Sequence, residues 1–206
     1  MKSQLRIAAL SMAVAALAAN SADAQRRRGL VDVSERSDRH GFWFQAGVGA
    51  GKDQFKFADE NSYADNPTKP TFTIRMGGTV SPNFRLGGEL TSYVNSFTNG
   101  AGYRTTEYVG GLFLIGQYYP IRDAGFFIKG GGGLTRSGAD VSGGQGTSED
   151  GFGFTAGAGY EIRLGRAIYL TPTVDWFNHR SGQQGQPDLL EHVFSVGIGF
   201  TIQPGR

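Results

Sequence analysis

The stretch Phe194-Ser-Val-Gly-Ile-Gly-Phe-Thr-Ile202 decides the fold, because large apolar residues occupy every even position and small or polar residues every odd one. Alternate side chains of a β-strand point to opposite faces, so this period predicts a strand with one apolar face. The chain also carries 33 glycines and no cysteine. Glycine weakens an ordinary strand, but in a narrow barrel it leaves room inside and permits tight bends. The stretch therefore predicts the closing strand of a membrane-spanning β-barrel.

Seven earlier stretches show a related alternation, which is least regular between residues 106 and 119. The predicted strands cover residues 41–51, 71–80, 84–94, 106–119, 126–134, 151–163, 167–178 and 194–202. Long links (52–70, 95–105, 136–150, 179–190) alternate with short ones (81–83, 120–125, 164–166). Long extracellular loops and short periplasmic turns are typical of outer-membrane barrels. The sequence thus predicts an all-β fold, an eight-stranded antiparallel up-and-down transmembrane β-barrel.

The first 24 residues have the pattern of a signal peptide. Lys2 and Arg6 flank a short apolar run at residues 7–19, which is followed by Ala22-Asp23-Ala24. A basic start, an apolar segment and an A-x-A site are typical of cleaved export signals. We therefore expect a signal peptide at 1–24, a flexible periplasmic segment at 25–40, the barrel at 41–203 and a tail at 204–206.

Charge and composition argue against several kinds of partner. Removing the signal leaves a formal charge of +1, which disfavours nucleic acid as a partner. The absence of cysteine excludes disulfides and thiolate metal sites, and no His and carboxylate spacing matches a zinc site. We expect no cofactor and no bound metal.

The inward face of the predicted strands carries the charged side chains. They are Arg75, Arg85, Glu89, Glu107, Lys129, Glu161, Arg163 and Asp175. A soluble barrel would need a strongly charged outer face, and this set is too sparse for one. A turn centred near Pro82 would place Arg75 opposite Glu89. Because eight strands enclose a lumen that side chains nearly fill, we expect a charge network that plugs the barrel, with a narrow pore for small or apolar solutes as the alternative.

The strand pattern, the strand end Tyr118-Tyr119-Pro120 and the closing strand 194–202 resemble the small outer-membrane β-barrel proteins of Gram-negative bacteria, of the OmpA-transmembrane or OmpX type. The resemblance covers residues 41–203. It implies an outer-membrane location, contact with membrane lipid and lipopolysaccharide, insertion by the barrel assembly machinery, and a structural or surface-interaction role. The chain departs from the family in ending Gln203-Pro-Gly-Arg206 rather than on an aromatic residue.

One short motif suggests an enzyme instead. His179-Arg-Ser181, with Glu191 ten residues later, is similar to the lipid A 3-O-deacylases, barrels in which His activates Ser and Glu orients His. This chain has Gly182 where those enzymes have Asn. Strand parity places His179 on the inward side, whereas an enzyme acting on membrane lipid needs it outside. The motif leaves a lipid A hydrolase as a second alternative to a non-enzymatic barrel.

Overall fold

The computed structural model describes residues 39–203, except 99, 101, 145 and 183–187. Its elements are β1 (Phe42–Phe57), β2 (Ala64–Asp65), β3 (Lys69–Ser81), β4 (Phe84–Thr98), β5 (Arg104–Tyr118), β6 (Phe126–Val141), β7 (Thr147–Tyr160), β8 (Ile162–Arg163), β9 (Ile168–Ser181) and β10 (Leu189–Ile202). β2 and β8 have two residues each, so eight long strands remain. No helix in this described part of the chain is long and apolar enough to cross a membrane.

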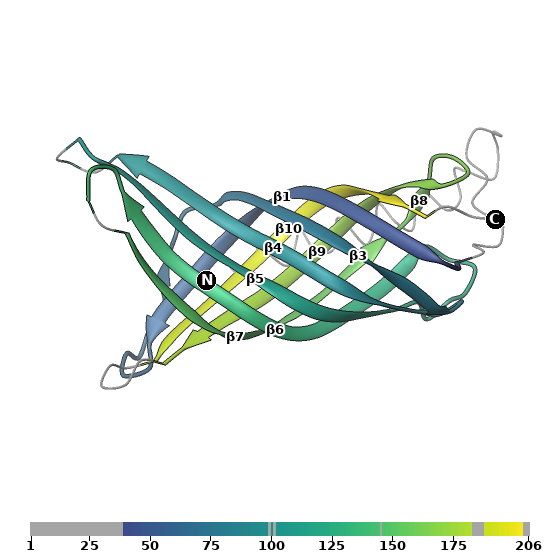
Figure 1. Ribbon diagram of the computed structural model, residues 1–206, viewed down its shortest axis with the longest axis horizontal. Helices are drawn as coiled ribbons and strands as arrows, with labels where there is room; N and C mark the ends of the chain where they lie inside the picture. Colours follow the sequence, from purple (N-terminus) through teal and green to yellow (C-terminus); the bar gives the residue numbers. More distant parts are fainter. Residues whose placement is uncertain (1–38, 99, 101, 145, 183–187, 204–206) are drawn as a thin grey trace, which may run out of the picture. The chain divides into compact units, whose positions relative to one another are not determined.

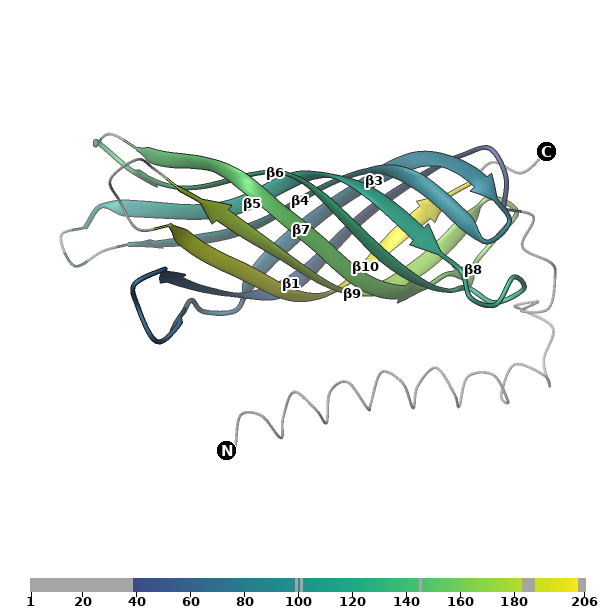
Figure 2. The same ribbon diagram turned by 90° about the horizontal axis from the view of Figure 1, so that it is seen from below.

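The eight long strands form one closed antiparallel barrel, which Figures 1 and 2 show from two sides. Neighbours in the chain pair in order, and β10 closes the barrel by pairing with both β9 and β1. The closing register joins Phe44 to Ile202 and continues to Phe57 and Leu189. The predicted fold class and the role of 194–202 as the closing strand are confirmed.

Large apolar side chains form a belt around the outside of the barrel. Exposed members are Phe42, Val48, Phe72, Ile74, Met76, Leu86, Leu90, Leu112, Leu114, Ile128, Leu134, Phe152, Phe154, Trp176, Phe194, Ile198, Phe200 and Ile202. An apolar band of this kind is what hydrocarbon chains of a bilayer require. Toward the extracellular side the outward side chains change from apolar to polar. On β1, Lys52 and Gln54 come after Ala50, and on β10, His192 comes before Phe194. We take these changes as the extracellular limit of the membrane-spanning part.

The predicted long loops were too long, because the strands continue past the belt. β1 runs to Phe57, and β6 runs to Val141, six or more residues beyond the predicted ends. Beyond the belt the outward face borders water in place of lipid, so the residues no longer alternate although the backbone ladder persists. The long strands have 13 to 16 residues, more than the roughly 9–11 that a tilted strand needs to cross a bilayer.

At their extracellular ends the strands separate into two groups. Pairing between β3 and β4 starts at Thr71 and Tyr93, so residues 94–98 of β4 pair only with β5. Pairing between β7 and β9 likewise stops at Phe152 and Arg180. In Figure 1 the ends of β4 and β6 diverge from those of β1 and β9. We call the ends of β4, β5, β6 and β7 the β4–β7 group, and the ends of β9, β10 and β1 the β9–β1 group.

Candidate functional site

The centre of the barrel holds four charged side chains from four strands. Arg75 of β3 lies opposite Glu89 of β4 in register, and their Nε and Oε2 atoms are 2.5 Å apart. Lys129 of β6 and Asp175 of β9 lie on either side of Gly157 on β7, with Nζ and Oδ1 3.1 Å apart. We call Arg75, Glu89, Lys129 and Asp175 the central network.

The two halves of the central network join across the lumen. Arg75 Nη2 lies 2.8 Å from Asp175 Oδ1, and Lys129 Nζ donates to Glu89. Thr155 adds a donor to Glu89 Oε1 at 2.9 Å. Two positive charges therefore meet two negative charges, and all four side chains are almost completely removed from solvent. Such a balanced arrangement avoids the cost of an unpaired buried charge.

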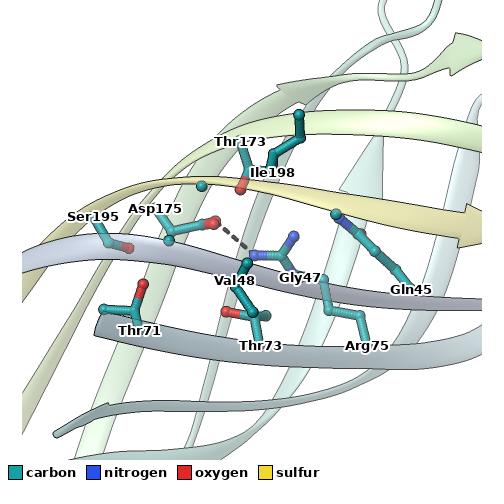
Figure 3. Close-up of a pocket in the computed structure, with 13 residues that line it drawn as sticks. Gln45, Gly47, Val48, Thr71, Thr73, Arg75, Thr173, Asp175, Ser195 and Ile198 are labelled. Carbon is teal, nitrogen blue, oxygen red and sulfur yellow. Dashed lines mark ion pairs between the residues drawn. The ribbon is translucent and has the colours of Figure 1, made fainter.

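Glycine at position 157 makes room for this arrangement. A Cβ atom there would lie 2.5 Å from Asp175 Oδ1 and 2.9 Å from Lys129 Cε. Beside the network lies a cavity of about 10 Å³ between β1, β3, β9 and β10. Figure 3 shows Arg75 pointing into it, with the ion pair to Asp175 and the hydroxyls of Thr71 and Thr73 nearby. This volume suits about one water molecule.

Apolar side chains fill much of the remaining lumen. Phe113 and Phe177 are about 1–2% exposed, and their ring centroids lie 6.2 Å apart. The buried cluster also contains Trp43, Tyr93, Val109, Ile115 and Val193. These residues lie at the odd, inward positions of their strands. The interior is therefore a packed core of rings and paired charges.

A second network closes the periplasmic end. Arg85 Nη1 lies 2.5 Å from Glu161 Oε1 and donates to the Tyr119 hydroxyl, also at 2.5 Å. Arg39 stacks over the Tyr119 ring at 3.7 Å and lies 3.6 Å from Glu161. Its guanidinium also donates to the carbonyl oxygens of Arg122 and Ala124 in the β5–β6 turn. Arg39, just before β1, is thus fixed across the periplasmic mouth.

Gln203 completes this periplasmic network from the other end of the chain. Its side-chain oxygen accepts from Arg85, and its Nε2 donates to the carbonyl of His40 at 3.0 Å and to Thr79 Oγ1 at 3.2 Å. Gln203 is 3% exposed and Arg39 is 4% exposed. The expected flexible periplasmic segment 25–40 therefore contains a buried and hydrogen-bonded residue, Arg39. Residues 25–38 lie outside the described residues, as do the expected signal peptide 1–24 and the expected tail 204–206.

Two of the eight predicted lumen charges lie outside the central and periplasmic networks, although Glu107 still faces the lumen. Arg163 lies in the short strand β8, because β7 ends at Tyr160, and its Nε donates to the carbonyl of Gly165 in the following turn at 3.1 Å. Glu107 lies near the extracellular end of β5 and accepts from Asn95 Nδ2 at 3.0 Å, away from the central network. The remaining six form the central network (Arg75, Glu89, Lys129, Asp175) and part of the periplasmic one (Arg85, Glu161).

The structure places the residues of the deacylase-like motif inside the barrel with separate partners. His179 and Ser181 are 1% and 3% exposed. His179 Nδ1 shares a hydrogen bond with Thr135 Oγ1 at 2.7 Å, and the Ser181 hydroxyl donates to Glu149 at 2.5 Å. Glu191 faces His179 in register but interacts with Asp53 and Ser137. A nucleophile must be hydrogen-bonded to its base, and this pairing is not formed between Ser181 and His179.

Several residues of the lumen were missed in the sequence. Arg39 and Gln203 lie outside the alternating stretches, and nothing in the sequence marks them. Phe113 lies in the least regular stretch, where successive apolar residues hide the strand period. Trp43 and Phe177 lie at alternate positions of the predicted strands 41–51 and 167–178, and this alternation is the signal that could have predicted an apolar filling. No group of three or more His, Asp or Glu side chains within the described residues could hold a metal ion.

Comparisons with known proteins agree with this architecture. A family model described as the outer membrane protein beta-barrel domain matches residues 8–201. No curated protein sequence matches the chain. The structure of Ail, the attachment invasion locus protein of Yersinia pestis, in complex with the heparin analogue sucrose octasulfate, is similar with a TM-score of 0.57 and 10% identity, over 79% of this chain and 99% of that one.

Neisserial surface protein A (NspA) is similar with a TM-score of 0.51 and 16% identity, over 80% of this chain and 97% of that one. At these identities the two structures support the fold alone. The family model, in contrast, covers nearly the whole chain. The protein therefore belongs to the outer membrane protein beta-barrel domain family and resides in the outer membrane.

Proposed function

We propose that the protein is a non-enzymatic outer-membrane scaffold, whose filled lumen fixes the strands while their extracellular extensions contact partners at the cell surface. The central network carries this proposal. It links β3, β4, β6 and β9 through the middle of the barrel with balanced charges. A network of this kind stiffens a barrel and leaves little room for a solute.

The extracellular extensions supply the surface for such contacts. Polar and aromatic side chains cover them, including Tyr63, which stacks edge-on against His192 at 4.7 Å, and Lys56, which lies over the Tyr63 ring at 5.0 Å. Loops placed on a rigid scaffold commonly carry binding functions. Membrane lipid and lipopolysaccharide surround the belt below, and the assembly machinery remains an expected partner during insertion.

A narrow pore is the main alternative, and planar-bilayer recording separates the two. We expect no discrete conductance steps at low voltage from the wild-type protein, and steps from Phe113→Ala/Phe177→Ala, which removes two inward rings. Leu112→Ala/Trp176→Ala is the matched control, because it truncates the neighbouring outward side chains of the same strands. Steps from the wild-type protein would contradict a filled lumen.

The hydrolase alternative has less support, because Ser181 and His179 have separate partners inside the barrel. Mass spectra of lipid A from cells that express the protein test it directly. We expect the acyl pattern to stay unchanged. Loss of an acyl chain with the wild-type protein, but not with Ser181→Ala, would assign the enzymatic activity and overturn the proposal.

A further inference from the structure

Two acidic side chains lie inside the barrel beyond the extracellular limit of the belt. Asp53 of β1 and Glu191 of β10 are 1% and 8% exposed. Their strands pair here, with Asp53 opposite Val193 and Phe55 opposite Glu191. The outward residues at this level are Lys52, Gln54 and His192, so both carboxyl groups lie outside the membrane-spanning part.

Glu191 is two residues from Val193, the residue opposite Asp53, so the two carboxyl side chains are diagonal neighbours on the inward face. Asp53 Oδ2 accepts from Asn66 Nδ2 at 2.7 Å, and Glu191 interacts with Ser137. Asp53 Oδ1 and Glu191 Oε2 are buried and have no hydrogen-bond partner among the described residues. An ionised carboxylate is only an acceptor, so these two buried carboxyl groups can hydrogen-bond to each other only when one of them carries a proton.

The groups around the pair do not neutralise it. Tyr93 of β4, Glu107 of β5 and Ser137 of β6 interact with it, and His179 of β9 lies opposite Glu191 in register. Asn95 donates to Glu107, and Glu149 of β7 interacts with His179. Glu107 adds negative charge, and burial lowers the pKa of His179, which favours the neutral ring. The buried cations Arg75 and Lys129 are engaged by Glu89 and Asp175 in the central network.

We propose that Asp53 and Glu191 form a proton-binding pair, which holds one shared proton at neutral pH and releases it under alkaline conditions. Burial and the negative charge of its partner raise the pKa of Glu191 to about 8, and burial raises that of Asp53 to about 6. Both pKa values in the folded state lie above ordinary carboxyl values. The proton therefore stabilises the fold at lower pH, and this stabilisation is lost as pH rises through about 8.

The pair lies where the two groups of extracellular strand ends meet. Asp53 and Glu191 belong to the β9–β1 group, whereas Glu107 and Ser137 belong to the β4–β7 group. While the proton is bound, the pair carries one negative charge beside Ser137 and Glu107 of the other group. After its release, two adjacent carboxylates face each other and Glu107 across the lumen, and like charges at short range repel. The extracellular ends thus respond to pH, whatever partner they bind.

Infrared spectra of the wild-type protein in lipid vesicles, with isotope-labelled carboxyl groups, test the pair. We expect a protonated carboxyl band at pH 7 that disappears as pH rises above about 8. The band should be lost in Glu191→Gln, and Asp53→Asn provides a second variant should that one fail to insert. Asp65→Asn is the control, because this exposed carboxylate pairs with Lys52 at 2.6 Å and its pKa is lowered.

Three results would overturn the proposal. The first is a wild-type spectrum without a protonated carboxyl band at pH 7. The second is a band that persists in both Glu191→Gln and Asp53→Asn. The third is a band that vanishes at pH 7 when Ca²⁺ is added, which would assign the pair to a cation in place of a proton. A band that titrates and is unchanged by Ca²⁺ and by Asp65→Asn supports it.

Discussion

Replacing Glu89 with glutamine should strongly destabilise the barrel. In the folded protein the Glu89 carboxylate accepts from Arg75 Nε at 2.5 Å, from Lys129 Nζ, and from Thr155 Oγ1 at 2.9 Å. Glutamine keeps the shape but removes the charge, so Arg75 and Lys129 share Asp175 alone. One buried positive charge is then uncompensated.

The expected loss follows from this imbalance. Removing one partner of a buried ion pair typically costs about 3–5 kcal/mol, because the other charge stays desolvated. A loss of about 4 kcal/mol lowers the equilibrium constant for folding roughly a thousandfold. The charges are nearly inaccessible to solvent, so added salt should change the loss little.

A second substitution distinguishes charge imbalance from general damage. Glu89→Gln/Lys129→Met removes one charge of each sign and leaves Arg75 with Asp175, 2.8 Å apart. We expect it to be more stable than Glu89→Gln. Urea unfolding of the inserted protein, followed by the mobility shift of the folded barrel on a gel, measures the free energy of unfolding. Asp150→Asn, which breaks an exposed pair with Arg136, is the control and should have little effect.

The reasoning would be refuted by either of two results. A loss below about 1 kcal/mol for Glu89→Gln would mean that solvent or a shifted side chain compensates the charge. A double variant less stable than Glu89→Gln would mean that shape and packing, not charge balance, determine the stability of the central network.

The same unfolding measurement checks three further substitutions. Gly157→Ala should lower the free energy of unfolding by about 1–3 kcal/mol, because the new Cβ would contact Asp175 and Lys129 too closely. Gly165→Ala is the control and should leave the free energy of unfolding unchanged, because no atom lies within 4 Å of its new Cβ. Gln203→Ala should cost about 1–3 kcal/mol, because buried Arg85 loses one of its acceptors although it keeps Glu161 and Tyr119. A chain ending at Gln203 should insert normally, and its failure to insert would place an essential signal in 204–206. Arg39→Ala should destabilise less than Glu89→Gln, because Glu161 keeps Arg85 at 2.5 Å, and an equal or larger loss would show that Arg39 is the main partner of Glu161.

The strands within the membrane could be predicted because lipid imposes a strict period. Residues 194–202 illustrate this: their even positions carry the apolar side chains that lipid requires, and the structure exposes Phe194, Ile198, Phe200 and Ile202. Above the belt both faces of a strand tolerate polar residues. The ladder from Lys52 to Phe57 therefore left no period in the sequence, and the strand end could not be located.

Pairing inside the lumen was partly predictable for a similar reason. Arg75 and Glu89 are separated by one tight turn, so their register follows from counting residues. Lys129 and Asp175 meet them only after the sheet has closed, through contacts between distant strands. Arg39 and Gln203 reach the periplasmic mouth from outside the strand pattern. These contacts form only when the barrel closes, so no local feature of the sequence predicts them.

The separation of the strand ends into two groups has a consequence for how the molecule opens. Residues 94–98 of β4 and 147–151 of β7 each lack a neighbour on one side, while the same strands are paired on both sides nearer the periplasm. Backbone amides resist solvent exchange according to the free energy of the opening that frees them. The protection of backbone amides from exchange should therefore vary along each strand rather than from strand to strand. Within one strand, amides at the extracellular end should exchange quickly and amides near the periplasm slowly.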